Sequence, residues 1–331
     1  MKGLVIKNTG SWYDVRTDDG QLFACKVKGN FRLRGIRSTN PVAVGDWVEI
    51  TPLVNGQQST VNGQQSMVNG QCSMVNGLIC EIHDRRNYII RRASNLSKQS
   101  HIIAANVDLA CLIVTIAHPE TSTTFIDRFL ASAEAYRVPV AIIFNKIDLY
   151  DEDERRYLDA VMNLYRYLDY PCFAVSAETG EGIEEMFSFL QGKTSLFSGN
   201  SGVGKSTLLN RLVPEARAKT AALSEAHDQG LHTTTFSEMF ELGRPTPNPS
   251  YIIDTPGIRG FGTFDFERAE VSHYFREIFR FGQDCRFGNC THTHEPGCAV
   301  LKALENHEIA ESRYQSYLSI LEDKDEDRYR H

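Results

Sequence analysis

The stretch Gly199–Ser206, with the sequence GNSGVGKS, limits the fold of this chain more than any other feature. It matches GxxxxGK[ST] at every fixed position. The apolar run Ser195–Phe197 before it predicts a strand, and Ser206–Leu212 after it predicts a helix. In that context the glycines let backbone N–H groups converge on phosphate oxygens. A glycine-rich turn that binds nothing is the alternative, but the flanking strand and helix favour a site for a nucleoside triphosphate.

Individual roles follow from the geometry of such a loop. The helix that starts near Lys205 brings the positive end of its dipole to the phosphates. Lys205 can reach the β- and γ-phosphates, and the Ser206 hydroxyl can ligate Mg²⁺. The residues expected to contact the nucleotide here are Gly199, Asn200, Ser201, Gly202, Val203, Gly204, Lys205, Ser206 and Thr207.

Recognition of the base is predicted at the ends of two other strands. NKID, Asn145–Asp148, follows the apolar run Val138–Phe144, at the strand end where α/β sheets place ligands. Asp148 can accept hydrogen bonds from guanine N1–H and N2–H₂, Asn145 can bond N7, and the stem of Lys146 can cover the base. After the next predicted strand come Ser176 and Ala177, where a backbone N–H can hold guanine O6. The NKxD pattern alone often occurs by chance, but together with the phosphate loop it favours a site that binds GTP and GDP.

Two further motifs follow the phosphate loop, GLHTTT at Gly230–Thr235 and DTPG at Asp254–Gly257. Asp254 is placed to hold Mg²⁺ through water, and the Gly257 N–H to contact the γ-phosphate. Thr234 is expected to close over Mg²⁺. The near-continuous apolar run Val107–Ile116 predicts another buried strand. Strands alternate with helices across this region, which indicates a doubly wound α/β sheet. Base recognition precedes the phosphate loop, so the motif order is circularly permuted relative to an ordinary GTPase.

The catalytic set is predicted to be Lys205, Thr234 and His232. Ile258 stands after Gly257, where many GTPases have the glutamine that orients attacking water. Isoleucine cannot hydrogen-bond water, and His232 is the nearest candidate by motif. The alternative, that His232 only orders its loop, stays open.

Short β-type segments dominate the first hundred residues, the last two at Leu78–Ile82 and Tyr88–Arg91. Five or six such segments predict a small closed barrel of the OB-fold type. Residues 1–100 carry 13 Lys and Arg against 7 Asp and Glu. Arg85, Arg86 and other basic residues can be a solvated surface or an RNA contact. Residues 54–77 repeat Val-Asn-Gly with a period of seven, which predicts a polar loop between two barrel strands. An adhesive or regulatory role for the repeat is the alternative.

Three cysteines and a histidine cluster late in the chain, at Cys285, Cys290, His292 and Cys298. Thiolate and imidazole ligands in this number suit one tetrahedral, structural Zn²⁺. His294 is a second histidine close by. After the cluster we expect a last helix at His307–Leu321, followed by a charged, frayed tail from Glu322. The remaining cysteines of the eight are scattered, which is typical of a reduced cytoplasmic protein. No apolar run has the length of a signal peptide or a membrane span, and we expect a monomer without a membrane partner.

The permuted motifs, Gly45–Val48 (GDWV), Arg85–Tyr88 (RRNY) and the Cys/His cluster together resemble the ribosome small subunit-dependent GTPase A family over essentially the whole chain. The resemblance implies GTP hydrolysis stimulated by the small (30S) ribosomal subunit during its late assembly, with rRNA as a partner. It assigns the fourth zinc ligand to His292 and the positioning of water to His232.

The resemblance also implies a multidomain architecture. The expected parts are an OB-fold barrel at residues 1–100 with the repeat loop 54–77, a permuted α/β GTPase domain at 101–265, and a small zinc-binding α domain with C-terminal helices at 266–331. Leu231 departs from the family, which usually has arginine there, and the repeat is not part of the family pattern. Two alternatives are a GTPase acting on another RNA or protein target, and a nucleotide-gated RNA-binding module without significant hydrolysis.

Overall fold

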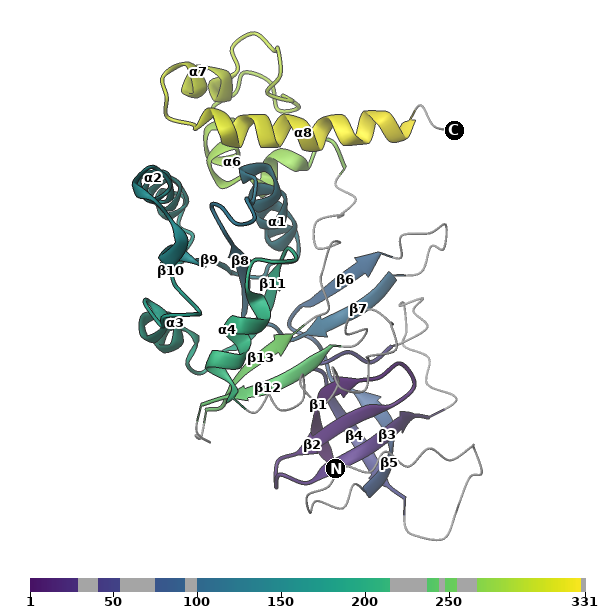
Figure 1. Cartoon of the computed structure of the whole chain (residues 1–331). Helices are drawn as coiled ribbons and strands as arrows, with labels where there is room; N and C mark the ends of the chain where they lie inside the picture. The colour runs from purple at the N-terminus through teal and green to yellow at the C-terminus, as the bar shows by residue number, and fades with distance from the viewer. Residues whose placement is uncertain are drawn as a thin grey trace.

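The structure is a computed structural model with three parts that follow one another along the chain: a barrel, an α/β sheet and a helical end (Figure 1). It describes residues 1–28, 41–53, 75–92, 100–214, 237–243, 248–254 and 267–328. Within these residues no helix is long and apolar enough to cross a membrane.

The first part is a closed barrel of five strands. These are β1 (Lys2–Asn8), β2 (Tyr13–Thr17), β3 (Leu22–Val27), β4 (Trp47–Pro52) and β5 (Val75–Ile82). They pair in the order β1-β2-β3-β5-β4, and β4 returns to β1 and closes the barrel. Alternate residues point inward and form the apolar core Val5, Tyr13, Val15, Phe23, Cys25, Val42, Val48, Ile50 and Ile79. The predicted small barrel is confirmed.

Two strand predictions in this region need correction. β5 begins at Val75 and not at Leu78, because the last Val-Asn-Gly of the repeat pairs in parallel with β3, Val75 opposite Phe23. Residues 54–74 of the predicted repeat loop lie outside the described residues. β6 (Tyr88–Arg92) is not a barrel strand: among the described residues it pairs with β7 (Ser100–Ala105) alone, in a separate sheet, and we did not predict β7.

The α/β part continues the sheet beyond the barrel. Its strands are β8 (Leu109–Val114), β9 (Val140–Phe144), β10 (Cys172–Ala174), β11 (Thr194–Gly199), β12 (Glu238–Leu242) and β13 (Ser250–Asp254). The order is β10-β9-β8-β11-β13-β12, parallel except for β12. β8 and β9 are buried on both faces, which explains their unbroken apolar sequences.

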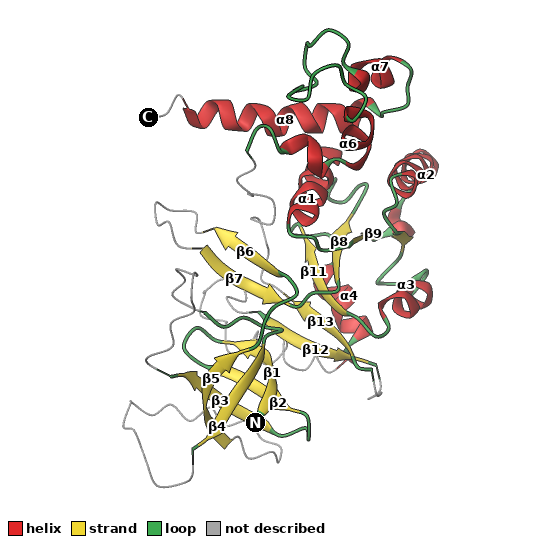
Figure 2. Cartoon of the chain, turned by 180° about the vertical axis from the view of Figure 1, so that it is seen from behind, coloured by secondary structure: helices red, strands yellow, loops and turns green. Residues whose placement is uncertain are grey.

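Helices cover both faces of this sheet, as Figure 2 shows. They are α1 (Thr123–Ala135), α2 (Glu152–Tyr167), α3 (Ile183–Leu190) and α4 (Lys205–Leu212). Buried residues of α1 and α2 pack into one apolar core and those of α3 and α4 into another, on opposite faces of the strands. Local sequence sets the helix starts: Asp151 and Glu154 form a capping box at α2. The predicted doubly wound sheet is confirmed.

The helical end consists of a short turn of 3₁₀ helix, Val271–Tyr274, followed by α6 (Arg276–Gly282), α7 (Ala299–Glu305) and α8 (Glu311–Arg328). We did not predict α6. We expected the last helix at His307–Leu321 with a frayed tail, and that is wrong at both ends: His307 has a φ of 62°, and the helix continues to Arg328.

Two buried ion pairs connect segments that are distant in the sequence. In the barrel region, Arg85 follows β5, and its Nε donates to Asp46 Oδ1 at 2.6 Å and its Nη2 to Asp46 Oδ2 at 2.6 Å. Neither a solvated surface nor RNA therefore accounts for Arg85. At the other end, Arg313 of α8 donates to Asp127 of α1 at 2.6 Å and to Glu277 of α6 at 2.6 Å. The motifs GDWV and RRNY meet at the first of these ion pairs.

Candidate nucleotide site and metal centre

The phosphate loop joins the end of β11 to the start of α4. Gly204 precedes the helix with a φ of 86°, a left-handed conformation that suits glycine. A Cβ atom there would clash with the Asn145 side chain, and one on Gly199 would clash with the Ile113 carbonyl. Ser206 and Thr207 are exposed in the first turn of α4. The glycine spacing that defined the motif is thus set by close approaches to β8 and to the NKID segment.

Lys205 and Asp254 come together because β11 and β13 are parallel neighbours, with Phe197 opposite Asp254. The Lys205 Nζ donates to Asp254 Oδ1, and the two side chains are 14% and 21% exposed. The ion pair keeps the Lys205 ammonium and the Asp254 carboxylate beside the phosphate loop. When nucleotide binds, a γ-phosphate would attract the ammonium and Mg²⁺ would attract the carboxylate.

Asn145 connects the phosphate loop to the Ser176–Gly180 loop. Its Nδ2 donates to the Val203 carbonyl at 2.8 Å, and its Oδ1 accepts from the Ala177 N–H at 3.0 Å. The side chain is 1% exposed. Our prediction gave Asn145 to guanine N7 and a backbone N–H near Ala177 to O6; in the structure the Asn145 amide and the Ala177 N–H bond each other. Among the described residues only the Val203 carbonyl accepts from Nδ2, so the bond to guanine N7 stays a prediction.

The other two NKID residues differ in their surroundings. The Lys146 Nζ donates to the His118 carbonyl at 2.6 Å, and its side chain passes close to Gly204 of the phosphate loop. Asp148 lies in the short 3₁₀ helix Ile147–Leu149, is exposed, and has no hydrogen-bond partner among the described residues. Its carboxylate is therefore available to a ligand. The Ser176 Oγ accepts from the Thr179 N–H at 3.0 Å and so shapes the adjacent loop.

Arg211, in the last turn of α4, was missed by the sequence analysis. Its guanidinium donates to the carbonyls of Ala177 at 3.0 Å, Glu178 at 3.0 Å and Thr179 at 3.2 Å. The only sequence signal is a basic residue near a helix C-terminus, which is commonplace. Three predicted site residues, His232, Thr234 and Gly257, lie outside the described residues, as does Ile258, and their roles stay predictions.

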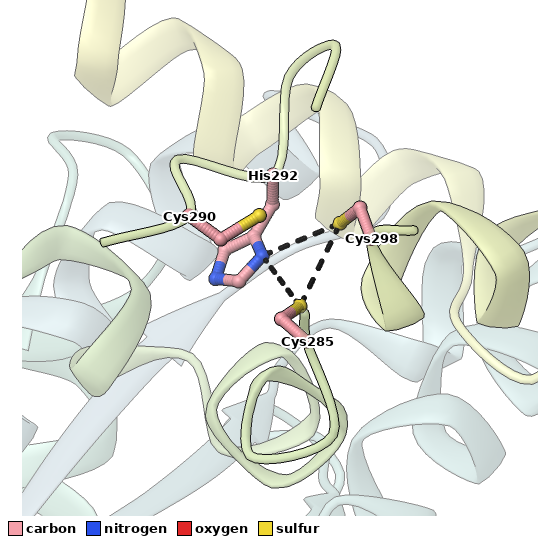
Figure 3. A group of neighbouring side chains, drawn as sticks. All are labelled: Cys285, Cys290, His292 and Cys298. Atoms are coloured by element: carbon pink, nitrogen blue, oxygen red, sulfur yellow. Dashed lines mark hydrogen bonds between the residues drawn. The ribbon is translucent and has the colours of Figure 1, made fainter. Parts of the chain in front are cut away.

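Cys285, Cys290, His292 and Cys298 converge at the helical end, with their ligand atoms within 4.8 Å of one another (Figure 3). His292 Nδ1 lies 3.5 Å from both Cys285 Sγ and Cys298 Sγ, which are 3.8 Å apart. Burial lowers the pKa of His292, which favours the neutral imidazole that a metal requires. His294 is exposed and bonds Thr293, so His292 and not His294 belongs to this cluster.

Backbone and tyrosine groups hold the cluster in place. Cys298 caps α7, and the N–H groups of Leu301 and Ala299 donate to Cys298 Sγ and Cys285 Sγ at 3.5 and 3.3 Å. Tyr314 of α8 donates to the His292 carbonyl at 2.8 Å. Three sulfurs and one imidazole nitrogen fit a closed, tetrahedral Zn²⁺ site, and the N–H groups would stabilise the thiolate charge.

Comparisons with known proteins agree with this geometry. The family model described as RsgA GTPase matches residues 82–264, and the RsgA N-terminal domain model matches residues 2–61. Over 330 residues, 100% of this chain and 99% of the relative, the chain is 63% identical to a small ribosomal subunit biogenesis GTPase RsgA of Bacteroides fragilis. A protein of the same name from Porphyromonas gingivalis is 58% identical over the same shares.

Two solved structures are similar over nearly the whole chain. YjeQ from Thermotoga maritima has a TM-score of 0.71 at 34% identity, with 97% of each chain covered. YloQ, described as a circularly permuted GTPase, has a TM-score of 0.69 at 26% identity, with 98% of this chain and 95% of that chain covered.

Proposed function

The chain belongs to the RsgA GTPase family, and we propose that it hydrolyses GTP to GDP and phosphate while bound to the small ribosomal subunit, late in assembly of that subunit. The main support for nucleotide binding is that the buried Asn145 amide hydrogen-bonds both the phosphate loop and the loop at Ala177. These bonds would fix the position of the base site relative to the phosphate site.

We assign the nucleotide contacts as follows. Gly199–Thr207 surround the phosphates, while Asn145, Lys146, Asp148, Ser176 and Ala177 surround the guanine, and Gly257 completes the γ-phosphate site. Ser206, Thr234 and Asp254 would hold Mg²⁺, which supplies charge neutralisation between the phosphates. Lys205 binds phosphate oxygens once it is released from Asp254.

The hydrolytic step needs a group that positions water. His232 takes that role in our proposal, because Ile258 stands at the usual glutamine position. Its imidazole orients the attacking water while the loop N–H groups and Lys205 bind the phosphate oxygens. Subunit binding would stimulate turnover by placing His232 next to the attacking water, so that GTP is hydrolysed only on the subunit.

The remaining assignments belong to the same proposal. The chain works as a cytoplasmic monomer with rRNA as a contact, and Cys285, Cys290, His292 and Cys298 hold one structural Zn²⁺. We propose domain limits of 1–100, 101–265 and 266–331.

Phosphate release from GTP, measured with and without purified small subunits, tests the function. We expect slow release alone and strong stimulation by small subunits but not by large ones. Hydrolysis without any stimulation would support a GTPase with a different target. No hydrolysis under any condition, with GTP still bound, would support a nucleotide-gated RNA-binding module.

A further inference from the structure

Arg211 holds the backbone of the Ser176–Gly180 loop from the side of the phosphate-loop helix. Three successive carbonyls, those of Ala177, Glu178 and Thr179, accept from its guanidinium at 3.0, 3.0 and 3.2 Å. The rigid fork of arginine suits several acceptors at once, which a lysine could not match. A Cβ atom on Gly180, whose φ is 94°, would clash with Nη2 of the same guanidinium. The loop therefore passes directly over Arg211.

These carbonyl contacts fix where the loop N–H groups point. In a planar trans peptide the C=O and the following N–H point in opposite directions. Because the Ala177 carbonyl faces Arg211, the Glu178 N–H faces away from it. Among the described residues the Glu178 N–H has no acceptor, whereas the Ala177 N–H donates to Asn145 Oδ1 at 3.0 Å. The donor that remains for a guanine O6 at this loop is thus the one that Arg211 orients.

The helix that carries Arg211 also carries the phosphate loop. α4 begins at Lys205 and is eight residues long, with Leu208, Leu209 and Leu212 buried against the sheet. A single short helix thus connects the phosphate site at its N-terminus to the base loop at its C-terminal turn.

We propose that Arg211 is a positioning residue for guanine recognition, which orients the Glu178 N–H toward O6 and ties the base loop to the phosphate-loop helix. This inference rests on the proposed function, since it names what distinguishes guanine at the same site. Arg211 is itself exposed, so replacing it leaves no cavity in the core.

The test compares GDP with 6-thio-GDP, which keeps N1–H and the N2 amino group but replaces O6 with the weaker acceptor sulfur. For Arg211→Ala we expect GDP affinity to fall about three- to tenfold, as for loss of a well-oriented hydrogen bond. Affinity for 6-thio-GDP should change much less, so the ratio of the two dissociation constants moves toward one. Arg211→Lys, which can hold one carbonyl, should fall between Arg211→Ala and the wild type.

Arg166 provides a matched control. It is an exposed arginine on α2 that donates to the Cys172 carbonyl at 2.9 Å, at the start of β10 and away from the base loop. Arg166→Ala should keep the wild-type ratio.

Other outcomes would overturn the assignment. An unchanged ratio in Arg211→Ala, even with weaker GDP binding, would mean that Arg211 acts only on stability. A wild type that does not distinguish the two ligands would mean that the loop does not recognise O6. A wild type that binds ATP as tightly as GTP would instead refute the proposed guanine specificity of the whole site, which separates the two failures.

Discussion

Arg313 is the residue whose loss should most clearly separate the helical end from the α/β sheet. It is 1% exposed, and its guanidinium makes three hydrogen bonds, to Asp127 Oδ1 at 2.6 Å, Glu277 Oε1 at 2.6 Å and Glu277 Oε2 at 3.1 Å. Its guanidinium carbon also lies 4.6 Å from the centre of the Phe275 ring. The change to test is Arg313→Met, which keeps much of the volume and removes the charge.

The expected loss is about 3–5 kcal/mol of unfolding free energy, because two buried carboxylates lose their counter-charge. A surface ion pair would contribute only ~0–1 kcal/mol. For a cooperative unit of this size the change corresponds to a drop in Tm of roughly 6–20 °C. The matched control is Arg156→Met, since Arg156 pairs with Asp153 on α2 while both side chains are more than 70% exposed.

The pH dependence of the unfolding free energy is a second, independent test of the Arg313 ion pairs. Burial raises the pKa of Asp127, and Arg313 opposes that rise. Without Arg313 the folded-state pKa rises further above the unfolded value, so the folded variant binds protons that the unfolded chain releases. Its stability then falls as pH rises through that window. We expect the deficit of Arg313→Met relative to wild type to be larger at pH 8 than at pH 6.

Urea unfolding followed by far-UV circular dichroism, with amide hydrogen exchange in α8, measures both effects. Adding Asp127→Asn and Glu277→Gln to Arg313→Met should recover part of the loss, since no unpaired charge then remains. A loss of less than about 1 kcal/mol of unfolding free energy at both pH values would refute the reasoning, because removing one partner of a buried ion pair destabilises a protein by more than that. So would equal effects from Arg313→Met and Arg156→Met.

Four further predictions concern the nucleotide, the metal and the repeat. Asp148→Asn should shift nucleotide preference from GTP toward xanthosine triphosphate, whose C2 oxygen replaces the amino donor; equal competition by both nucleotides in variant and wild type would contradict it. His232→Ala should keep GTP affinity while single-turnover hydrolysis on saturating small subunits falls about 10²-fold; an undiminished rate would leave His232 an ordering role only. His292→Ala should lose the zinc that metal analysis finds in wild type, whereas His294→Ala should keep it; the reverse result would exchange the ligands. Deleting residues 61–74, two whole repeats, should leave Tm and nucleotide affinity nearly unchanged, because lengthening a loop adds little closure entropy; a large drop in Tm would mean that the repeat packs against the core.

Sequence alone identified the features whose cause is local. Unbroken apolar runs marked β8 and β9, because strands buried on both faces need them. The Cys/His spacing indicated four ligands that the fold does bring within 4.8 Å. The phosphate loop was recognisable because close approaches to neighbouring segments exclude a side chain at Gly199 and Gly204.

What the sequence could not indicate depends on contacts between distant segments. Arg85 resembled any surface arginine, yet its partner Asp46 lies 39 positions earlier. Arg211 resembled an ordinary helix-end cation, because its acceptors are backbone carbonyls that leave no mark in the sequence. Val75 opens the last Val-Asn-Gly unit of the repeat, where Asn-Gly signals a turn, and pairing with β3 makes it a strand residue. There local propensity gave way to tertiary contacts.

The barrel is connected to the same sheet that positions the nucleotide motifs. The Asn8 N–H of β1 donates to the Ser237 carbonyl at 3.3 Å, and Ser237 stands two residues after the GLHTTT segment. From β2, Arg16 donates to Glu241 of β12 and to Tyr251 of β13, each at 2.7 Å. β12 follows the segment that carries His232, and β13 ends at Asp254. These contacts therefore connect the barrel to β12 and β13, the strands nearest in sequence to the predicted catalytic and magnesium groups.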